Sequence, residues 1–283
     1  DTKTKFEIDL LAKQIEFNGY KYVLPYSMEV NFLNNYDNEC NNSCVSIKEE
    51  DNYLSFTLLF LVFIMTVSAI ITAAGKNSRM RKDQISRNIS VKNKLILPFH
   101  NKTVLETTID NALSSNVDEC IVVLGHYSDE IKEAIFDNYK DSVKFVENNP
   151  VDVGLSVSLL NGLKNISSDF ALCITGDQPT VSSETFDEMI NVCKNSDNPE
   201  KTIAILRRRK TGLLDTAEGL GMPFVAFKDN LIKYLENEND NLNPILRKIF
   251  DDGYTFYGIK EKNELELLNI NHYDDYLKLL DNF

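Results

Sequence analysis

The feature that most constrains the fold is a regular alternation of short apolar runs with longer amphipathic stretches, which begins near Met65. The apolar runs have the length and the branched side chains of buried strands, and helical stretches fill the gaps between them. The expected strands are Val67–Thr72, Glu119–Leu124, Val143–Val146, Ala171–Thr175, Thr202–Leu206, Phe224–Phe227 and Thr255–Ile259. The expected helices are Val104–Ser115, Asp129–Tyr139, Val157–Asn165, Ser183–Cys193 and Leu242–Asp252. This alternation predicts an α/β domain in which helices wrap a mostly parallel sheet.

The first part of the chain differs from the rest. Residues 1–56 are rich in Asn and in scattered aromatic side chains, and they contain no constellation of groups that suggests a chemistry. With 283 residues, of which 43% are hydrophobic, the chain can form one large α/β domain and an appendage. We therefore expect a short N-terminal appendage of unassigned role over residues 1–64 and the functional domain over residues 65–283.

A nearly continuous apolar stretch, Leu58–Ala74, joins these two parts and is close to the length that spans a bilayer. It ends in an Ala-Ala-Gly turn, and no cluster of Lys and Arg precedes Leu58 to orient a membrane anchor. A hydrophobic linker that runs into the first strand is therefore the preferred interpretation. A membrane-tethered protein remains a minor alternative.

Charge and cysteine content narrow the partners and the compartment. A net charge of −13 argues against a nucleic-acid partner, because such binding draws on clustered Lys and Arg. The one dense basic run, from Arg207 to Lys210, is interpreted as the solvent-exposed end of a strand. A free nucleotide stays compatible with this charge, since a few local cations can hold it. Five cysteines without a disulfide framework indicate a reducing compartment, and we expect a cytoplasmic location.

The first strand leads into the sequence A-A-G-K-N-S-R-M. Ala73, Ala74 and Gly75 carry almost no side chain, so backbone N–H groups can close around phosphate oxygens at this turn. Arg79 adds a fixed positive charge four residues beyond Gly75. The sequence thus suggests a site for a polyanion. An ordinary strand-to-helix turn with a surface Arg is the alternative.

A carboxylate follows the fourth strand in the sequence G-D-Q-P, where Asp177 stands on a tight turn. In parallel sheets ligands bind beyond the carboxyl ends of the strands, so this turn and the Ala-Ala-Gly turn are expected to meet. Mg²⁺ prefers one or two oxygen ligands from the protein, with water and phosphate oxygens completing its shell. Asp177 is therefore a candidate Mg²⁺ ligand, and a turn-forming Asp is the simpler alternative.

Two further side chains are candidates for the same site. A short strand expected within Leu267–Asp275 places Asn269 and Asn271 on one face, and Asn271 is the better second oxygen ligand because it lies nearer the strand exit. Asp274 and Asp275 are expected to cap the last helix, Asp275–Leu280. Lys94, in K-L-I-L-P, supplies another cation.

The stretch from Asn148 to Leu163 contains a third phosphate- or base-binding candidate. Gly154 and Ser156 stand before a predicted helix whose free N–H groups can hold anionic or carbonyl oxygens. Helix capping by Ser156 explains the pattern nearly as well.

Taken together and in this order, the motifs resemble those of the MobA-like nucleotidyltransferases, most closely the molybdenum cofactor cytidylyltransferase branch. The segments that carry the resemblance are T-A-A-G-K-N-S-R-M from Thr72, K-L-I-L-P from Lys94, N-P from Asn149, G-L-S-V-S-L-L-N-G-L from Gly154, G-D-Q-P from Gly176, G-M-P-F-V-A-F from Gly221 and N-I-N-H-Y-D-D from Asn269. They cover about residues 66–280.

The resemblance implies a Rossmann-like, GT-A-like three-layer fold and a reaction in which an acceptor oxygen attacks the α-phosphate of CTP or GTP, so that pyrophosphate leaves. The acceptor in that branch is a phosphorylated molybdopterin-type cofactor, and Mg²⁺ is the metal. The implied roles are binding of pyrophosphate by Arg79 and the amides of Ala73, Ala74 and Gly75, binding of the α-phosphate by Lys94, binding of Mg²⁺ by Asp177 and Asn271, and contact with the nucleotide by Gly154 and Ser156.

The chain departs from the family pattern at three places. First, no Gly follows Met80, and a loop longer than that of the family is expected over Arg81–Asn93. Second, Asn replaces both acids of the late D-x-D motif. Third, the G-D-x-G-A-R motif is not evident, and the sequence D-N-L-N-P from Asp240 stands in that region. These departures leave open two other hypotheses. One is a nucleotidyltransferase that acts on a sugar phosphate or another small phosphorylated acceptor, and the other is a nucleotide-binding regulatory module that has lost catalysis.

Overall fold

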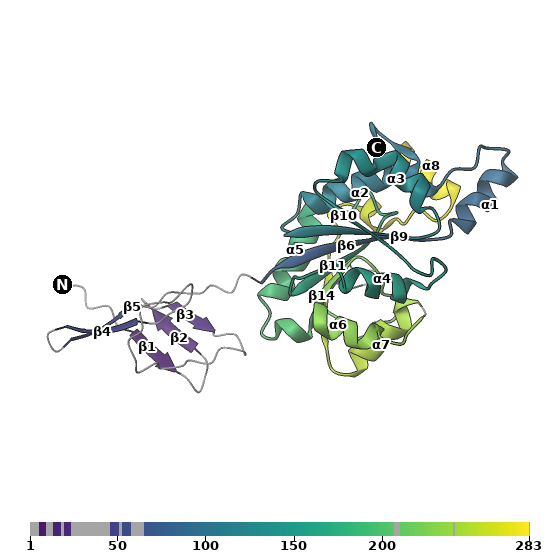
Figure 1. Cartoon of the computed structure of the whole chain (residues 1–283). Coiled ribbons are helices and arrows are strands. Elements are labelled where there is room, and N and C mark those ends of the chain that lie inside the picture. The colour runs from purple at the N-terminus through teal and green to yellow at the C-terminus, as the bar shows by residue number, and fades with distance from the viewer. Residues whose placement is uncertain are drawn as a thin grey trace. The chain divides into compact units, whose positions relative to one another are not determined.

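The structure is a computed structural model that describes residues 65–206, 210–239 and 241–282 with their side chains, together with the backbone of five strands before residue 58. The chain divides into two compact units, Asp1–Ile64 and Met65–Phe283 (Figure 1). In the first unit, strands β1 (Phe6–Asp9), β2 (Gln14–Phe17) and β3 (Tyr20–Val23) form an antiparallel sheet, and β4 (Ser46–Glu50) pairs with β5 (Tyr53–Thr57). Of the basic run from Arg207 to Lys210, the first three residues lie outside the described residues, and Lys210 is exposed.

The second unit is built around an eight-stranded sheet with the order β10-β9-β6-β11-β14-β12-β15-β13. Its strands are β6 (Val67–Ala73), β9 (Glu119–Leu124), β10 (Lys144–Glu147), β11 (Phe170–Thr175), β12 (Thr202–Leu206), β13 (Gly212–Leu213), β14 (Phe224–Phe227) and β15 (Thr255–Ile259). Only β14 and β13 run antiparallel to their neighbours. The chain order reverses beside β6, which places the carboxyl ends of β9, β6 and β11 around one crevice, the position where doubly wound sheets bind ligands.

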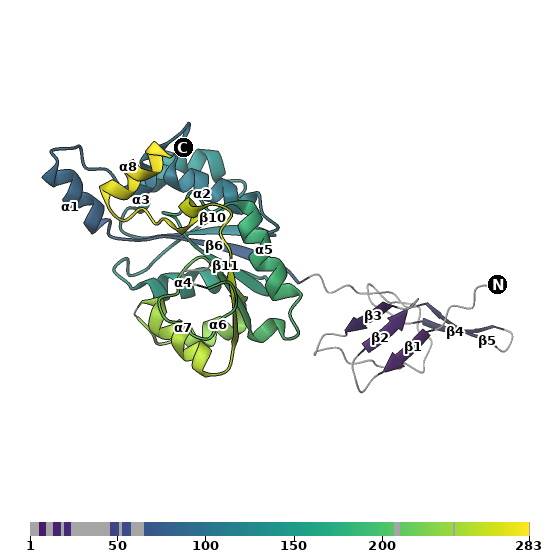
Figure 2. The same cartoon turned by 180° about the vertical axis from the view of Figure 1, so that it is seen from behind.

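Helices cover both faces of this sheet (Figures 1 and 2). The helices are α1 (Ser78–Ser86), α2 (Val104–Leu113), α3 (Ser128–Tyr139), α4 (Leu155–Leu163), α5 (Ser183–Lys194), α6 (Lys228–Leu235), α7 (Leu242–Asp251) and α8 (Tyr273–Asp281). Helices α2, α3 and α5 lie on one face, and α4, α6 and α7 lie on the other. The predicted three-layer α/β fold with a mostly parallel sheet is therefore confirmed.

Burial in the core explains why the alternation of apolar runs predicted the strands. Every residue of β6 is buried, as expected for a central parallel strand with helices on both sides. Gly162 of α4 lies so close to β6 that an added Cβ would stand 2.5 Å from Cγ2 of Ile70. Three described cysteines, Cys120, Cys173 and Cys193, are buried free thiols in this core, and burial raises the pKa of Cys120 and Cys193 to about 12.

Two local predictions were wrong. Residues 81–86 belong to helix α1 rather than to a loop, and the side chain of Gln84 is buried with Oε1 accepting a hydrogen bond from Lys92 N at 3.1 Å. The strand expected within Leu267–Asp275 does not form. A 3₁₀ turn, η3 (Glu264–Leu267), ends at Leu267, and the residues that follow it up to Asn271 belong to no helix or strand. This turn is held in place by the buried carboxylate of Glu266, which accepts hydrogen bonds from Ser182 and Thr185.

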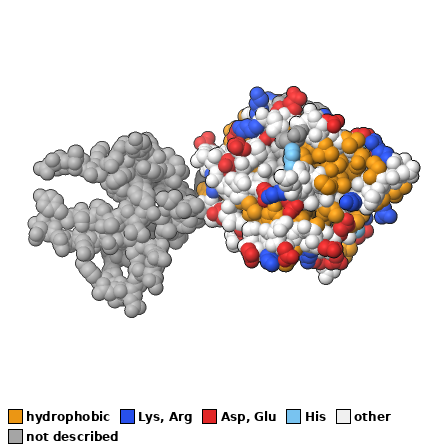
Figure 3. Space-filling view, turned by 90° about the horizontal axis from the view of Figure 1, so that it is seen from above, with side chains coloured by type: hydrophobic (Ala, Val, Ile, Leu, Met, Phe, Trp, Pro, Cys, Tyr) orange, Lys and Arg blue, Asp and Glu red, His pale blue; other side chains and the backbone are white. Residues whose placement is uncertain are grey.

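The surface adds two observations. On the face shown in Figure 3, Lys and Arg side chains are scattered among acidic ones and do not gather into a broad basic patch. No helix within the described residues is long and apolar enough to cross a membrane. The carboxyl-terminal part of the apolar stretch, from Val67 to Ala73, forms strand β6, as the linker interpretation predicts.

Candidate active site

The turn after β6 is held open by an unusual backbone residue. Asn77, the residue before α1, has φ of 55°, a left-handed conformation that Asn tolerates better than most side chains. Its amide donates to Lys92 O at 3.1 Å, and its Oδ1 accepts from Lys94 N at 3.4 Å. Asn77 thus ties the Ala-Ala-Gly turn to the segment that carries Lys94. Gly75 faces open space, since an added Cβ would find no atom within 4 Å.

Asp177 lies at the neighbouring turn, directly beyond β11. Gly176 N donates to Thr72 O at 3.0 Å, so this turn is bonded to the end of β6. Gly176 O accepts from Thr108 at 3.2 Å, and Asp177 O accepts from Ile270 N at 3.1 Å. These bonds hold the Asp177 side chain at the carboxyl end of the sheet with only 8% of the residue exposed.

Three of the predicted site residues contact one another. Nζ of Lys94 forms an ion pair with Oδ2 of Asp177 and donates to Oδ1 of Asn271 at 3.4 Å. Both charged side chains are largely shielded from solvent, with 17% and 11% of the Lys94 and Asp177 side chains exposed. A charge-assisted contact at such a shielded position is stronger than a surface ion pair. Lys94, Asp177 and Asn271 therefore form one polar centre.

This centre has the donor set for a hard divalent cation. Oδ1 of Asp177 is fully enclosed and accepts no hydrogen bond from any described residue. An enclosed carboxylate oxygen without a partner is costly, so the position favours a cation. Asn271 adds an amide oxygen, and the remaining ligands would be phosphate oxygens and water, which suits Mg²⁺ or Mn²⁺. Within the described residues, no group of three or more His, Cys, Asp or Glu side chains could hold a metal without such help.

The predicted nucleotide contacts at α4 lie in a different setting. Gly154 precedes the helix, and its N–H donates to Oδ1 of Asn239 at 2.7 Å. Ser156 is fully buried, and its hydroxyl donates to Glu238 O at 3.1 Å. Both residues thereby fasten α4 to the segment before α7. A direct contact between either residue and a nucleotide stays a prediction.

Arg79 is solvent-exposed on the first turn of α1 and does not touch the Lys94 centre. The helix that carries it is attached to the start of α8. Oδ2 of Asp83 accepts from Tyr273 N at 3.1 Å and lies 2.9 Å from Nδ1 of His272. The Tyr273 N–H and the His272 ring hold the pKa of Asp83 below its ordinary value. Arg87 forms a second link, at 2.7 Å to Asp274.

A cavity of about 490 Å³ adjoins the centre. It is bounded by Leu155 at the start of α4, Thr175 at the end of β11, Met222 before β14, Asn243 and Arg247 of α7, and Asn269. Asn269 and Thr175 are two residues from Asn271 and Asp177, respectively. Two residues that line the cavity are therefore close along the chain to residues of the polar centre.

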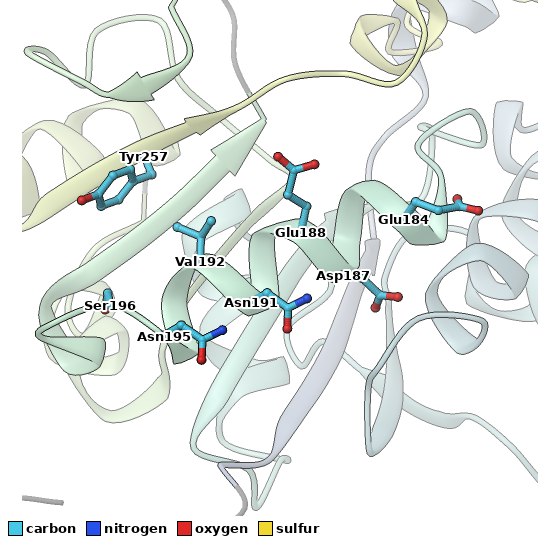
Figure 4. A pocket seen from close by; sticks show the side chains of 8 residues that line it. All are labelled: Glu184, Asp187, Glu188, Asn191, Val192, Asn195, Ser196 and Tyr257. Carbon is cyan, nitrogen blue, oxygen red and sulfur yellow. The ribbon is translucent and has the colours of Figure 1, made fainter. Parts of the chain in front are cut away.

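A second cavity of about 690 Å³ lies along α5, and its lining side chains are shown in Figure 4. Glu184, Asp187 and Glu188 contribute three carboxylates, and Tyr257 of β15 closes one end. Among the described residues that line it there is no Lys or Arg. Its charge repels a nucleoside triphosphate, so we place the candidate site at the Lys94 centre despite the larger volume here.

The geometry and the fold together define a class. A doubly wound sheet with a small-residue turn, a shielded Lys and an enclosed Asp at its carboxyl edge is the arrangement of an α/β nucleotidyltransferase. The family model described as the MobA-like NTP transferase domain matches residues 69–250. The chain belongs to this family.

The chain is also similar to solved structures and to curated proteins. A nucleotidyl transferase from Methanothermobacter thermautotroptrophicus is 42% identical, with a TM-score of 0.71, and the match covers 77% of this chain and 97% of that one. A manganese complex of Rv0371c from Mycobacterium tuberculosis H37Rv shares the fold at 22% identity and a TM-score of 0.53, over 77% of this chain and all of that one.

The Bifunctional protein GlmU from Francisella tularensis subsp. novicida is 25% identical over 202 residues, or 71% of this chain. The chain spans about 39% of the length of the curated relatives that it matches first. Membership of the family thus extends to the nucleotidyltransferase domain and not to the full length of those relatives.

Sequence reasoning missed two residues of the site, Asn77 and Gln178. No role is predicted for Asn77 from the sequence, although an Asn after a small-residue turn is a known signal for left-handed backbone. Gln178 is fully buried, accepting from Thr175 at 2.7 Å and donating to Asn269 at 3.0 Å. Its place in G-D-Q-P was quoted without a role, because burial of a Gln cannot be read from one sequence.

Proposed function

We propose that the domain is a Mg²⁺-dependent nucleotidyltransferase that transfers CMP from CTP to a phosphorylated molybdopterin-type cofactor and releases pyrophosphate. The single observation that carries the proposal is the contact of Lys94 with Asp177 and Asn271 at the carboxyl edge of β6 and β11. The carboxylate and amide oxygens that contact this ammonium are also the kind of oxygen ligands that would hold a divalent cation. The choice of CTP and of the pterin rests on the resemblance of the ordered motifs.

The chain's own residues supply binding and orientation. The amides of Ala73 to Gly75 and the guanidinium of Arg79 would bind the β- and γ-phosphates, and Lys94 would bind the α-phosphate. Asp177 and Asn271 would hold the divalent cation, which neutralises charge on the phosphates when it is bound. Holding both substrates in line is the main source of rate enhancement in such transfers.

The bond changes balance without a general base. An oxygen of the acceptor phosphate attacks the α-phosphorus, a new P–O bond forms, and the bond from the α-phosphorus to the bridging oxygen breaks with pyrophosphate leaving. A phosphate oxyanion carries no proton that must be removed. This fits a site whose titratable contacts are an ion-paired Asp177 and Lys94.

The nucleotide is tested by thermal unfolding with CTP, GTP, ATP and UTP, each with and without Mg²⁺. A nucleotide at about 100 times its Kd adds about 2.7 kcal/mol to the unfolding free energy, which raises Tm by several degrees. We expect a shift that is largest for CTP and depends on Mg²⁺. A larger shift with GTP would move the assignment to guanylyl transfer, and no shift with any nucleotide would refute the proposal.

Asp177→Asn tests the metal role with nearly unchanged volume. We expect pyrophosphate release in the presence of acceptor to fall about 100-fold or more, because the cation loses its only carboxylate ligand at the centre. Asp141→Asn, at an exposed position after α3, is the matched control. Full activity of Asp177→Asn would contradict the metal assignment.

A further inference from the structure

Lys76 forms an ion pair that joins the Ala-Ala-Gly turn to the segment before α4. Its Nζ lies 2.6 Å from Oδ1 of Asp152. The pair is exposed, with 56% of the Lys76 side chain and 67% of the Asp152 side chain accessible to solvent. His126 lies beside it, with Nε2 3.9 Å from the same carboxylate oxygen and Nδ1 3.4 Å from Ala74 O. The turn therefore carries a lysine whose charge is balanced by a carboxylate from a distant part of the sequence.

Neither partner needs this ion pair to keep its backbone in place. The hydroxyl of Tyr127 donates a hydrogen bond to Lys76 O at 3.2 Å. In the other segment, Asn148 N donates to the last residue of β9 at 2.9 Å and Gly154 N donates to the segment before α7 at 2.7 Å, so the chain is bonded on both sides of Asp152. An exposed ion pair also contributes little to stability. The contact is therefore better explained by the charge at the turn than by structural support.

The exposure of the pair makes its ammonium exchangeable. A lysine side chain on a fixed backbone can turn from one anionic oxygen to another at little cost, because water solvates both partners during the exchange. A triphosphate carries several negative charges and therefore outcompetes a single carboxylate for the same ammonium. Gly75, directly before Lys76, has no atom within 4 Å of an added Cβ, so the space next to the turn is open to a phosphate.

We propose that Lys76 is a further cation of the nucleotide site, which binds the terminal phosphates of the triphosphate, and that Asp152 holds its ammonium until the nucleotide binds. The inference rests on the proposed function and adds a binding residue and a competing anion to the same site. The Lys76 ammonium holds the pKa of Asp152 below its ordinary value, so this carboxylate is an anion at neutral pH. Asp152 thus weakens nucleotide binding, because binding breaks its ion pair and leaves its charge near the phosphates.

Three variants of the full chain test this role: Lys76→Met, Asp152→Asn and the double variant. Lys164→Met, at the exposed end of α4, and Asp141→Asn, at an exposed position after α3, are the matched controls. Tm is expected to be the same in all of these chains, because other bonds hold the backbone near both partners. A fall of Tm by several degrees in both Lys76→Met and Asp152→Asn would identify the pair as a structural link and overturn the proposal.

The triphosphate with the largest thermal shift, expected to be CTP, and its monophosphate are titrated calorimetrically into each chain with Mg²⁺. We expect Lys76→Met to weaken triphosphate binding by about tenfold. Monophosphate binding should not change in this variant, because the monophosphate lacks the terminal phosphates. Asp152→Asn is expected to strengthen triphosphate binding by about threefold, since it releases an exposed ion pair. The double variant should bind the triphosphate less tightly than wild type, and both controls should match wild type.

The inference and the proposed function fail differently. If Lys76→Met and Asp152→Asn weaken triphosphate binding equally, Asp152 does not compete with the triphosphate. If the double variant binds the triphosphate as tightly as wild type, only the net charge at the turn matters and Lys76 does not contact phosphate. Either result would overturn the inference and leave the proposed function standing, because the wild-type chain still binds nucleotide. If the wild-type chain binds no nucleotide at all, the proposed function is refuted together with the inference that rests on it.

Discussion

Lys94 forms an ion pair with Oδ2 of Asp177, so the ammonium occupies one side of the carboxylate proposed to hold a divalent cation. It also lies 3.4 Å from Oδ1 of Asn271, the second proposed ligand. Without a nucleotide, the cation of the protein thus contacts the same two side chains that would hold the metal. Lys94 and a metal would therefore compete at this centre until a phosphate draws the ammonium away.

Lys94→Met is expected to strengthen the binding of Mn²⁺ in the absence of nucleotide by about tenfold, because it removes a positive charge next to the ligand oxygens. The same variant should weaken the binding of CTP, because the α-phosphate loses its cation. Free Mn²⁺ is measured by electron paramagnetic resonance. Lys92→Met, at an exposed neighbouring position, is the control. Equal Mn²⁺ affinity in Lys94→Met and wild type would rule out competition.

Asn77 should be sensitive in two separable ways. Asn77→Ala places a side chain with a Cβ and no hydrogen-bonding group at φ of 55°, which we expect to cost about 1–2 kcal/mol in urea unfolding. Asn77→Gly removes the bonds to Lys92 and Lys94 but accepts this backbone freely. We expect Asn77→Gly to lose less stability than Asn77→Ala, while both weaken CTP binding. Equal stability of the two variants would show that the left-handed backbone is not strained.

Gly125, just after β9, makes room for the Ala-Ala-Gly turn. A Cβ added there would stand 2.8 Å from both Cβ and O of Ala74, so Gly125→Ala must displace the turn. We expect CTP binding to weaken by about tenfold, measured by calorimetry. Ala74→Gly in the same chain removes one of the two clashes and should restore part of the affinity. If the double variant binds no better than Gly125→Ala alone, the contact with Ala74 is not the cause.

The link between Asp83 and α8 predicts a dependence of stability on pH. The Tyr273 N–H, and next the His272 ring, lower the pKa of Asp83 below 3.8, so its contribution is present above pH 3.8. It is lost as the pH falls through the lowered pKa of the folded state. We expect the difference in Tm between wild type and Asp83→Asn to shrink as the pH falls below 3.8. Asp141→Asn should match wild type throughout, and a constant difference down to pH 3 would exclude this cause.

Much of the fold could be predicted from the alternation of apolar runs with amphipathic stretches, because a parallel sheet buries whole runs of β-branched residues. Strands Glu119–Leu124 and Thr255–Ile259 were predicted to the residue. Helices α1 and α6 were not predicted, because both are short. In addition, α1 is polar almost throughout, with only Met80 and Gln84 buried. Attachment of such a helix depends on tertiary bonds, which no local pattern reveals.

Site residues could be predicted where a polar or charged side chain lies near the carboxyl end of a predicted strand. Asp177 and Asn271 were predicted from their positions at the ends of expected strands, and Lys94 was predicted as a cation of the K-L-I-L-P segment; the structure brings the three side chains into contact. Asn269 and Asn271 contact Gln178 and Lys94, respectively, although the strand expected to carry them is absent. The hydroxyl of Ser156 could not have been placed, since its partner is a backbone carbonyl 82 residues away.

The attachment of α1 to α8 has a mechanical consequence. Asp83 and Arg87 fix α1 to residues 272–274, and Asn271 stands directly before them. Arg79 and Asn271 are therefore linked to each other through α1 and the start of α8. A substitution that loosens the attachment of α1 would in this way affect both the proposed pyrophosphate contact and the proposed metal ligand.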